Sequence, residues 1–108
     1  MKYMLLINVD PSQWSEDISA EYMAFTQEIV ESGELVAGDP LEGRETATTV
    51  RVRDGKVTTT DGPFAETKEH IGGYYIVDVK DLDRALALAA RIPDARSGGI
   101  EVRPVRAM

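Results

Sequence analysis

Apolar residues fill both alternating sides of two stretches of the chain, residues 2–9 and 73–79. In the first stretch, Tyr3, Leu5 and Ile7 fall on one side of an extended backbone, and Met and Leu residues lie between them. A strand that is apolar on both sides is covered on both faces of its sheet. Both stretches are therefore predicted to be strands with protein on each face.

Two other stretches carry apolar residues at the three- and four-residue spacing of a helix. The first is predicted to begin near Ser19, a residue type that caps helices well, and to end at Gly33. The second covers residues 82–92, where Asp81 serves as the cap and Pro93 stops the helix.

A hairpin is predicted between the two helices. Residues 47–53 and 56–60 read as strands, and an Asp-Gly pair at 54–55 joins them with the residues that a two-residue turn requires. Along the first of these strands, Val50 and Val52 are expected to face inward and the neighbouring arginines outward.

A last strand at 100–106 completes the predicted order, β-α-β-β-β-α-β, with a short extended piece at 34–38 between the first helix and the hairpin. Two helices can cover only one face of such a sheet. A second copy, packed sheet to sheet about a twofold axis, would cover the other face, so a homodimer is predicted. The alternative is a monomer with a partly apolar open face or cleft, although large exposed apolar patches are rare.

The composition is that of an ordinary soluble protein with one domain, residues 1–108. The 19 acidic residues outnumber the 12 basic ones, giving a net charge of −7 that disfavours nucleic acids and anionic membranes as partners. There is no cysteine, which removes disulfides and thiol chemistry and fits a cytoplasmic location. The apolar start of the chain is too short to span a membrane.

The stretch 60–75 is longer than the usual connection between neighbouring strands. It contains an Asp-Gly-Pro-Phe run at 61–64, and a Gly-Gly pair at 72–73 that permits a close backbone approach. His70 is the only histidine of the chain, and histidine is the natural general acid or base near neutral pH. Asp61 is a candidate to orient it, so Asp61 and His70 are the candidate catalytic residues. The alternative is that His70 lies in a solvated loop and that Asp61 only fixes the turn.

Other side chains of this insert are candidate ligand-binding residues. Phe64 provides an apolar anchor, Glu66 a carboxylate and Lys68 a cation that could contact an anion. Phe64 is also expected in the core or in a dimer interface, where most aromatic residues are found.

No metal and no cofactor is predicted. Zinc sites need several His or Cys ligands, which a single histidine without cysteine does not supply. Carboxylates at Asp61, Glu66 and Glu69 could attract a hard cation, but their spacing matches no known loop. The Gly-Gly pair lacks the spacing of the phosphate-binding motifs.

The run Asp-Gly-Pro-Phe-Ala-Glu-Thr-Lys-Glu at 61–69, followed by Gly-Gly-Tyr-Tyr at 72–75, resembles the signature of YCII-related proteins of the DGPF type. The similarity extends to the opening Met-Lys-Tyr-Met-Leu-Leu-Ile and the closing Gly-Ile-Glu-Val-Arg-Pro-Val. This resemblance implies a ferredoxin-like α+β domain, an antiparallel sheet with two helices on one face, that pairs into a dimeric α+β barrel.

The broader YCII group is suspected of enzymatic activity through a His–Asp pair, with the histidine on the first helix and the aspartate at the end of the second. The histidine position falls on Tyr22 here, so Tyr22 is a further candidate ligand-binding residue. The aspartate position falls around residues 92–94, where Asp94 is at best displaced. The chain departs from the group's pattern at both places.

Two functions are therefore compared. The first is a homodimer that binds a small molecule in a cleft bordered by Asp61 and Phe64, with acid–base chemistry at His70. The second is a non-catalytic interaction or regulatory protein, as some members resemble genes beside extracytoplasmic-function sigma factors. A pocket on which Asp61 and His70 converge favours the first, and an insert buried against another chain favours the second.

Overall fold

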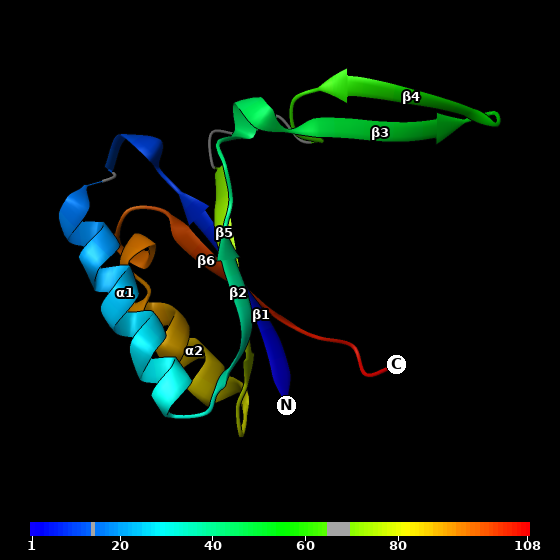
Figure 1. Cartoon of the computed structure of the whole chain (residues 1–108). Coiled ribbons are helices and arrows are strands. Elements are labelled where there is room, and N and C mark those ends of the chain that lie inside the picture. Colours follow the sequence, from blue (N-terminus) through cyan, green and yellow to red (C-terminus); the bar gives the residue numbers. More distant parts are fainter. Residues whose placement is uncertain (14, 65–69) are drawn as a thin grey trace.

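The computed structural model describes residues 1–13, 15–64 and 70–108. The fold is α+β, with a ferredoxin-like antiparallel sheet whose strand order is β2-β5-β1-β6 and two helices on one face (Figure 1). The sheet strands are β1 (Lys2–Val9), β2 (Leu35–Pro40), β5 (His70–Asp78) and β6 (Gly99–Pro104). The helices are α1 (Glu16–Glu31) and α2 (Leu82–Arg91), with short 3-10 turns η1 (Pro11–Gln13), η2 (Arg44–Thr46) and η3 (Pro93–Arg96).

The core lies between the sheet and the two helices. Leu5 of β1 and Val77 of β5 are fully buried, and they meet Ile29 of α1 and Leu88 of α2 in one cluster. The alternate residues of the central strands therefore lie on the opposite face of the sheet, as the two-residue period of a strand requires. The helical period predicted the buried face of α1, which contains Phe25 and Ile29. The face predicted for α2, with Leu82, Ala85, Leu86 and Ala89, is right only at the two alanines. Leu82 and Leu86 are each 47% exposed, and Leu88 is the fully buried leucine.

The first helix begins earlier than predicted, at Glu16 instead of near Ser19. Ser15 is the residue that caps it, because its side chain accepts a hydrogen bond of 3.3 Å from the backbone N–H of Ile18. Glu16 and Asp17 then add negative charge to the first turn, where the helix dipole favours it. The cap of α2 is confirmed, since the Asp81 carboxylate accepts from the backbone N–H of Arg84 at 2.8 Å.

The predicted hairpin is present, but it forms its own two-stranded sheet, β3 (Thr48–Arg53) and β4 (Lys56–Asp61). Figure 1 shows it projecting away from the four-stranded sheet. The turn residues Asp54 and Gly55 both have positive φ, 51° and 75°, as a primed two-residue turn requires. The inward orientation predicted for Val50 and Val52 is wrong, because they are 60% and 57% exposed. Alternation alone does not reveal whether any layer covers the face that it defines.

Two apolar rows therefore lie outside the core. One is on the hairpin, and the other is on the sheet face opposite the helices, where Met4, Leu6, Tyr74 and Ile76 are half-buried.

Among the helices of the described ranges, none is long and apolar enough to cross a membrane.

Candidate functional site

A cavity of about 750 Å³ opens between the first half of α1 and the sheet, and is called the α1 cavity below. Its walls come from the end of β1, one face of α1, the end of β2 and the start of β5. Its lining residues are Ile7, Val9, Asp10, Pro11, Ser19, Tyr22, Met23, Thr26, Gln27, Gly38, Asp39, Pro40, Leu41, Gly72, Gly73, Tyr74, Tyr75 and Asp94. Such a mixture of apolar walls and a few polar groups is typical of small-molecule sites.

Tyr22 and Asp94 form the most buried polar contact of this cavity. The Tyr22 phenol donates a hydrogen bond of 2.5 Å to Oδ2 of Asp94. Asp94 is only 8% exposed and is the buried charged residue of the described chain. Pro93 begins the 3-10 turn η3 immediately after α2, and this turn holds Asp94 against α1. Burial and the neighbouring carboxylate raise the pKa of Tyr22 well above its usual range, so the phenol keeps its proton.

A second pair of hydroxyls lies one helical turn further along α1. The Oγ1 of Thr26 and the phenol oxygen of Tyr75 are 2.6 Å apart. The Tyr75 ring is buried edge-on against Phe25, and burial raises the pKa of its phenol, although the bond to Thr26 opposes this. The hydrogen bond between the two oxygens uses one of their two hydroxyl hydrogens. The other hydrogen is available to donate to a ligand.

Glycines allow the walls of the cavity to approach closely. A Cβ at Gly38 would lie 2.7 Å from the ring of Tyr75, and one at Gly73 would lie 2.9 Å from the Asp39 carbonyl oxygen. These distances are shorter than ordinary van der Waals contact, so only glycine fits without a shift of the neighbours. The close approach predicted for the Gly-Gly pair is therefore confirmed at Gly73.

Two further aspartates line the cavity, but their side chains lie differently. Asp39 accepts a hydrogen bond of 2.8 Å from the Tyr74 phenol, which raises the pKa of that phenol. Asp39 and Tyr74 are paired across β2 and β5, so both side chains lie on the sheet face opposite the helices. Asp10 accepts from the hydroxyl and the backbone N–H of Ser12, at 2.7 and 3.0 Å. These two bonds lower the pKa of Asp10, and the charge of His70 contributes in the same direction.

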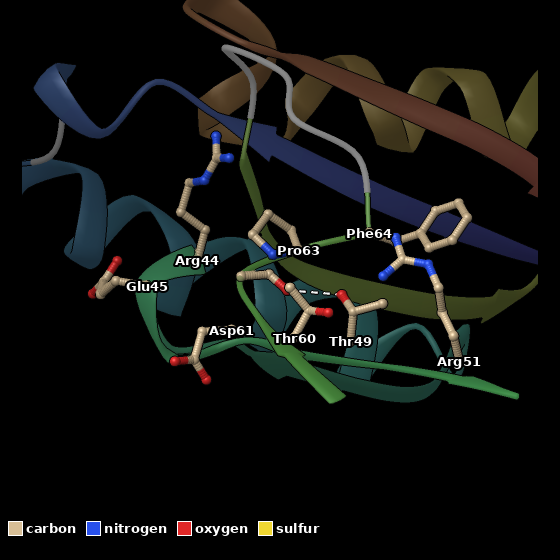
Figure 2. Close-up of a pocket in the computed structure, with 9 residues that line it drawn as sticks. Arg44, Glu45, Thr49, Arg51, Thr60, Asp61, Pro63 and Phe64 are labelled. Carbon is tan, nitrogen blue, oxygen red and sulfur yellow. Dashed lines mark hydrogen bonds between the residues drawn. The ribbon is translucent and has the colours of Figure 1, made fainter. Parts of the chain in front are cut away.

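Asp61 and Phe64 border a different, smaller cavity of about 540 Å³, at the base of the hairpin. Figure 2 shows the Asp61 carboxylate pointing away from Phe64. Phe64 is 75% exposed and therefore lies outside the core, and the Arg51 guanidinium is 5.3 Å from the centre of its ring. The turn between Asp61 and Phe64 is held by Thr49, whose hydroxyl donates to the Gly62 carbonyl at 2.7 Å (Figure 2).

His70 is the first residue of β5, paired with Val9 of β1, and is half-buried. Asp61 instead ends β4, in the separate two-stranded sheet. Asp10 is close enough to His70 for an electrostatic effect on its carboxylate. The sequence had not indicated this neighbour, because Asp10 follows β1 and lies far from His70 along the chain. The candidate residues Glu66 and Lys68 lie outside the described residues.

Of the predicted site residues that the structure describes, Tyr22 lines the α1 cavity, and it does so with groups that the sequence alone had not assigned. These are Asp10, Thr26, Tyr75 and Asp94. Tyr22 and Thr26 are one helical turn apart, and this spacing predicted that both lie on the buried face of the helix. It did not predict that they line a cavity. Among the residues that the structure describes, no group of three or more His, Asp or Glu is arranged to hold a metal ion.

Comparison with known proteins gives two matches. A family model described as the YCII-related domain matches residues 1–108. An uncharacterized protein of Rhizobium meliloti (strain 1021) is 36% identical over 100 residues, which cover 87% of this chain and 81% of that protein.

Proposed function

The chain belongs to the family of YCII-related domains, and we propose that it is a cytoplasmic protein that binds a small molecule in the α1 cavity. The observation that carries this proposal is the hydrogen bond from Tyr22 to the buried carboxylate of Asp94 at the wall of that cavity. A buried carboxylate with one hydroxyl partner, beside a cavity large enough for a ligand, is typical of a functional site.

Asp94 is the proposed proton acceptor. Its Oδ2 already receives the Tyr22 phenol, so its other oxygen would accept a proton from a C–H or N–H group of the ligand and return it to the product. Tyr22 keeps its own proton because its pKa is raised, and its hydrogen bond stabilises the charged carboxylate. In this scheme Tyr22 positions Asp94, and Asp94 carries the proton.

The positions of these two residues also match the resemblance. The suspected His–Asp pair of the broader group falls on Tyr22 and close to Asp94. The contact between them supports a pair of the same geometry in which a phenol replaces the imidazole. Acid–base chemistry at His70 with Asp61 is less well supported, because they belong to different sheets.

The proposal is tested by NMR with mixtures of small metabolites. Ligands are expected to shift the backbone amides of Thr26 and Tyr75, which line the α1 cavity, and to leave Val57 at the hairpin unchanged. Bound ligands are then followed in D₂O. Asp94→Asn should abolish exchange of an acidic ligand proton, and Tyr22→Phe should slow it by roughly 10–100-fold.

Tyr74→Phe is the matched control for Tyr22→Phe, since it removes a phenol that also donates to an aspartate, but on the opposite face of the sheet. Binding without exchange in the native protein would support a ligand-binding protein that is not an enzyme. Ligand shifts confined to residues outside the cavity would overturn the proposal.

The second candidate function, a non-catalytic interaction protein, rests on the exposed hairpin. Val52 and Val57 are opposite each other on β3 and β4, and Val50 lies on the same face. A single two-stranded hairpin is marginally stable in water, so an apolar face on it is expected to find a partner. We favour a second copy of the chain, because the half-buried sheet face also needs a cover. A protein of a sigma-factor system is the regulatory alternative.

A further inference from the structure

Two carboxylates from separate parts of the chain lie at the α1 cavity. Asp10 follows β1 and Asp94 belongs to η3. Among the described residues that line the cavity, none is lysine, arginine or histidine. The whole chain also has a net charge of −7. The potential inside the cavity is therefore negative, which raises the local concentration of cations and repels anions.

The side-chain donors to these two carboxylates are neutral hydroxyls. Asp94 accepts from the Tyr22 phenol, and Asp10 accepts from the Ser12 hydroxyl. His70 acts electrostatically on Asp10 from the start of β5.

The cavity also offers more acceptors than donors. A carboxylate has about four acceptor positions, and the described hydrogen bonds occupy one or two of them on each aspartate. The oxygen of Tyr22 can accept as well, since its hydrogen is directed to Asp94. The Thr26–Tyr75 pair has one hydrogen to donate. A ligand that fits this pattern must itself be rich in donors.

The remaining walls are apolar. Ile7, Val9, Met23 and Leu41 face the same space. From the negative potential, the excess of acceptors and these walls, we infer that the ligand is a small organic cation, an amine with an apolar body. This inference rests on the proposed function of the α1 cavity and adds the charge of the ligand to it.

The test compares three compounds of nearly the same size and shape, 2-phenylethylamine, 2-phenylethanol and phenylacetate. Their dissociation constants are measured by NMR titration at neutral pH and about 0.15 M salt, with the amides of Thr26 and Tyr75 reporting occupancy of the cavity. The amine is expected to bind at least about tenfold more tightly than the carboxylate, with the alcohol between them.

Asp10→Asn keeps the shape of the side chain and removes one charge at the cavity, and it should reduce the preference for the amine several-fold. Asp83→Asn is the matched control, because it removes the same charge from the exposed first turn of α2, away from the cavity. In this control, the preference should stay within about twofold of the native value, since exposed charges beyond a Debye length are screened.

The outcomes separate the inference from the proposal beneath it. Binding of phenylacetate in the cavity as tightly as the amine would overturn the inference and leave the proposed function intact. An equal loss of preference in Asp10→Asn and Asp83→Asn would also overturn it, since it would assign the effect to net charge. If none of the three compounds shifts the cavity amides at millimolar concentration, both the inference and the proposed cavity function are contradicted.

Discussion

The phenol oxygen of Tyr22 lies 2.5 Å from Oδ2 of Asp94, although the two residues are 72 positions apart in the sequence. Tyr22 lies on the face of α1 that meets the sheet, and η3 carries Asp94 to the same point after α2 has ended. The contact joins the two helical parts of the chain and provides a polar group at the wall of the α1 cavity.

Tyr22→Phe should lower the free energy of unfolding by about 1–3 kcal/mol, because it leaves the buried carboxylate of Asp94 without its phenol donor. Urea denaturation followed by circular dichroism measures this change. Tyr74→Phe removes the phenol bond to the exposed Asp39, and its effect should stay within about 0.5 kcal/mol. Equal effects of the two variants would show that the Tyr22–Asp94 bond has no special weight in stability.

The ion pair between Glu34 and Arg84 predicts a loss of stability in acid. Two bonds of 2.8 Å from the guanidinium lower the pKa of Glu34 from 4.5 to about 2. The unfolded chain therefore takes up a proton before the folded chain does. The ion pair makes its full contribution to the free energy of unfolding above about pH 4.5, and this contribution is lost as the pH falls toward 2.

Glu34→Gln should accordingly destabilise the protein by about 1–2 kcal/mol at pH 7, a value reduced for the partial exposure of Arg84, and by much less at pH 2.5. Glu28→Gln is the control, because its pair with Arg91 is exposed on both sides and should contribute about 0–0.5 kcal/mol. Unfolding curves at several pH values give both numbers. A pH-independent effect of Glu34→Gln would contradict the assignment.

Gly98→Ala should be strongly destabilising, by roughly 3 kcal/mol, because the new Cβ would lie 2.0 Å from the Asn8 carbonyl oxygen. The backbone would have to move, and with it the Gly98 N–H that donates to the Asp94 carbonyl at 2.8 Å. Gly99→Ala is the neighbouring control, as its Cβ would meet nothing within 4 Å. Thermal unfolding compares the two, and similar melting temperatures would show that β1 and η3 adjust easily.

Val57→Lys should weaken self-association at least about tenfold if the hairpin contacts a second copy. Val57 is 68% exposed in the single chain, so the substitution would place a charge in the apolar face that meets the partner. Thr58→Lys adds the same charge to the opposite face of β4 and should leave association nearly unchanged. Sedimentation measurements at several concentrations compare the variants with the native protein. A native protein that is monomeric at tens of micromolar would contradict the homodimer itself.

Much of the local structure could be predicted. The Asp54–Gly55 turn, the cap at Asp81 and the strand at residues 2–9 are confirmed, because each depends on residues close together in the chain. The start of α1 was misplaced because Ser15 and Ser19 are equally good caps by residue type. Only the bond from the Ile18 N–H to Ser15 distinguishes them.

The candidate site could be predicted only in part. Tyr22 was identified through a resemblance, but Asp94 was set aside because the sequence gave no reason to expect that η3 turns its carboxylate toward α1. Asp61 and His70 had been joined as a candidate pair because they share one insert. The structure instead places them in different sheets, and Asp10 lies near His70.

The sequence by itself therefore determined the order of the helices and strands and the buried face of α1. Those features follow from hydrophobic period, caps and turns, whose energies come from neighbouring residues. Only the tertiary structure decided that Tyr22 meets Asp94 and that Val50 and Val52 lack a covering layer within the chain. These outcomes depend on how distant segments pack against one another, and short-range preferences carry no information about that packing.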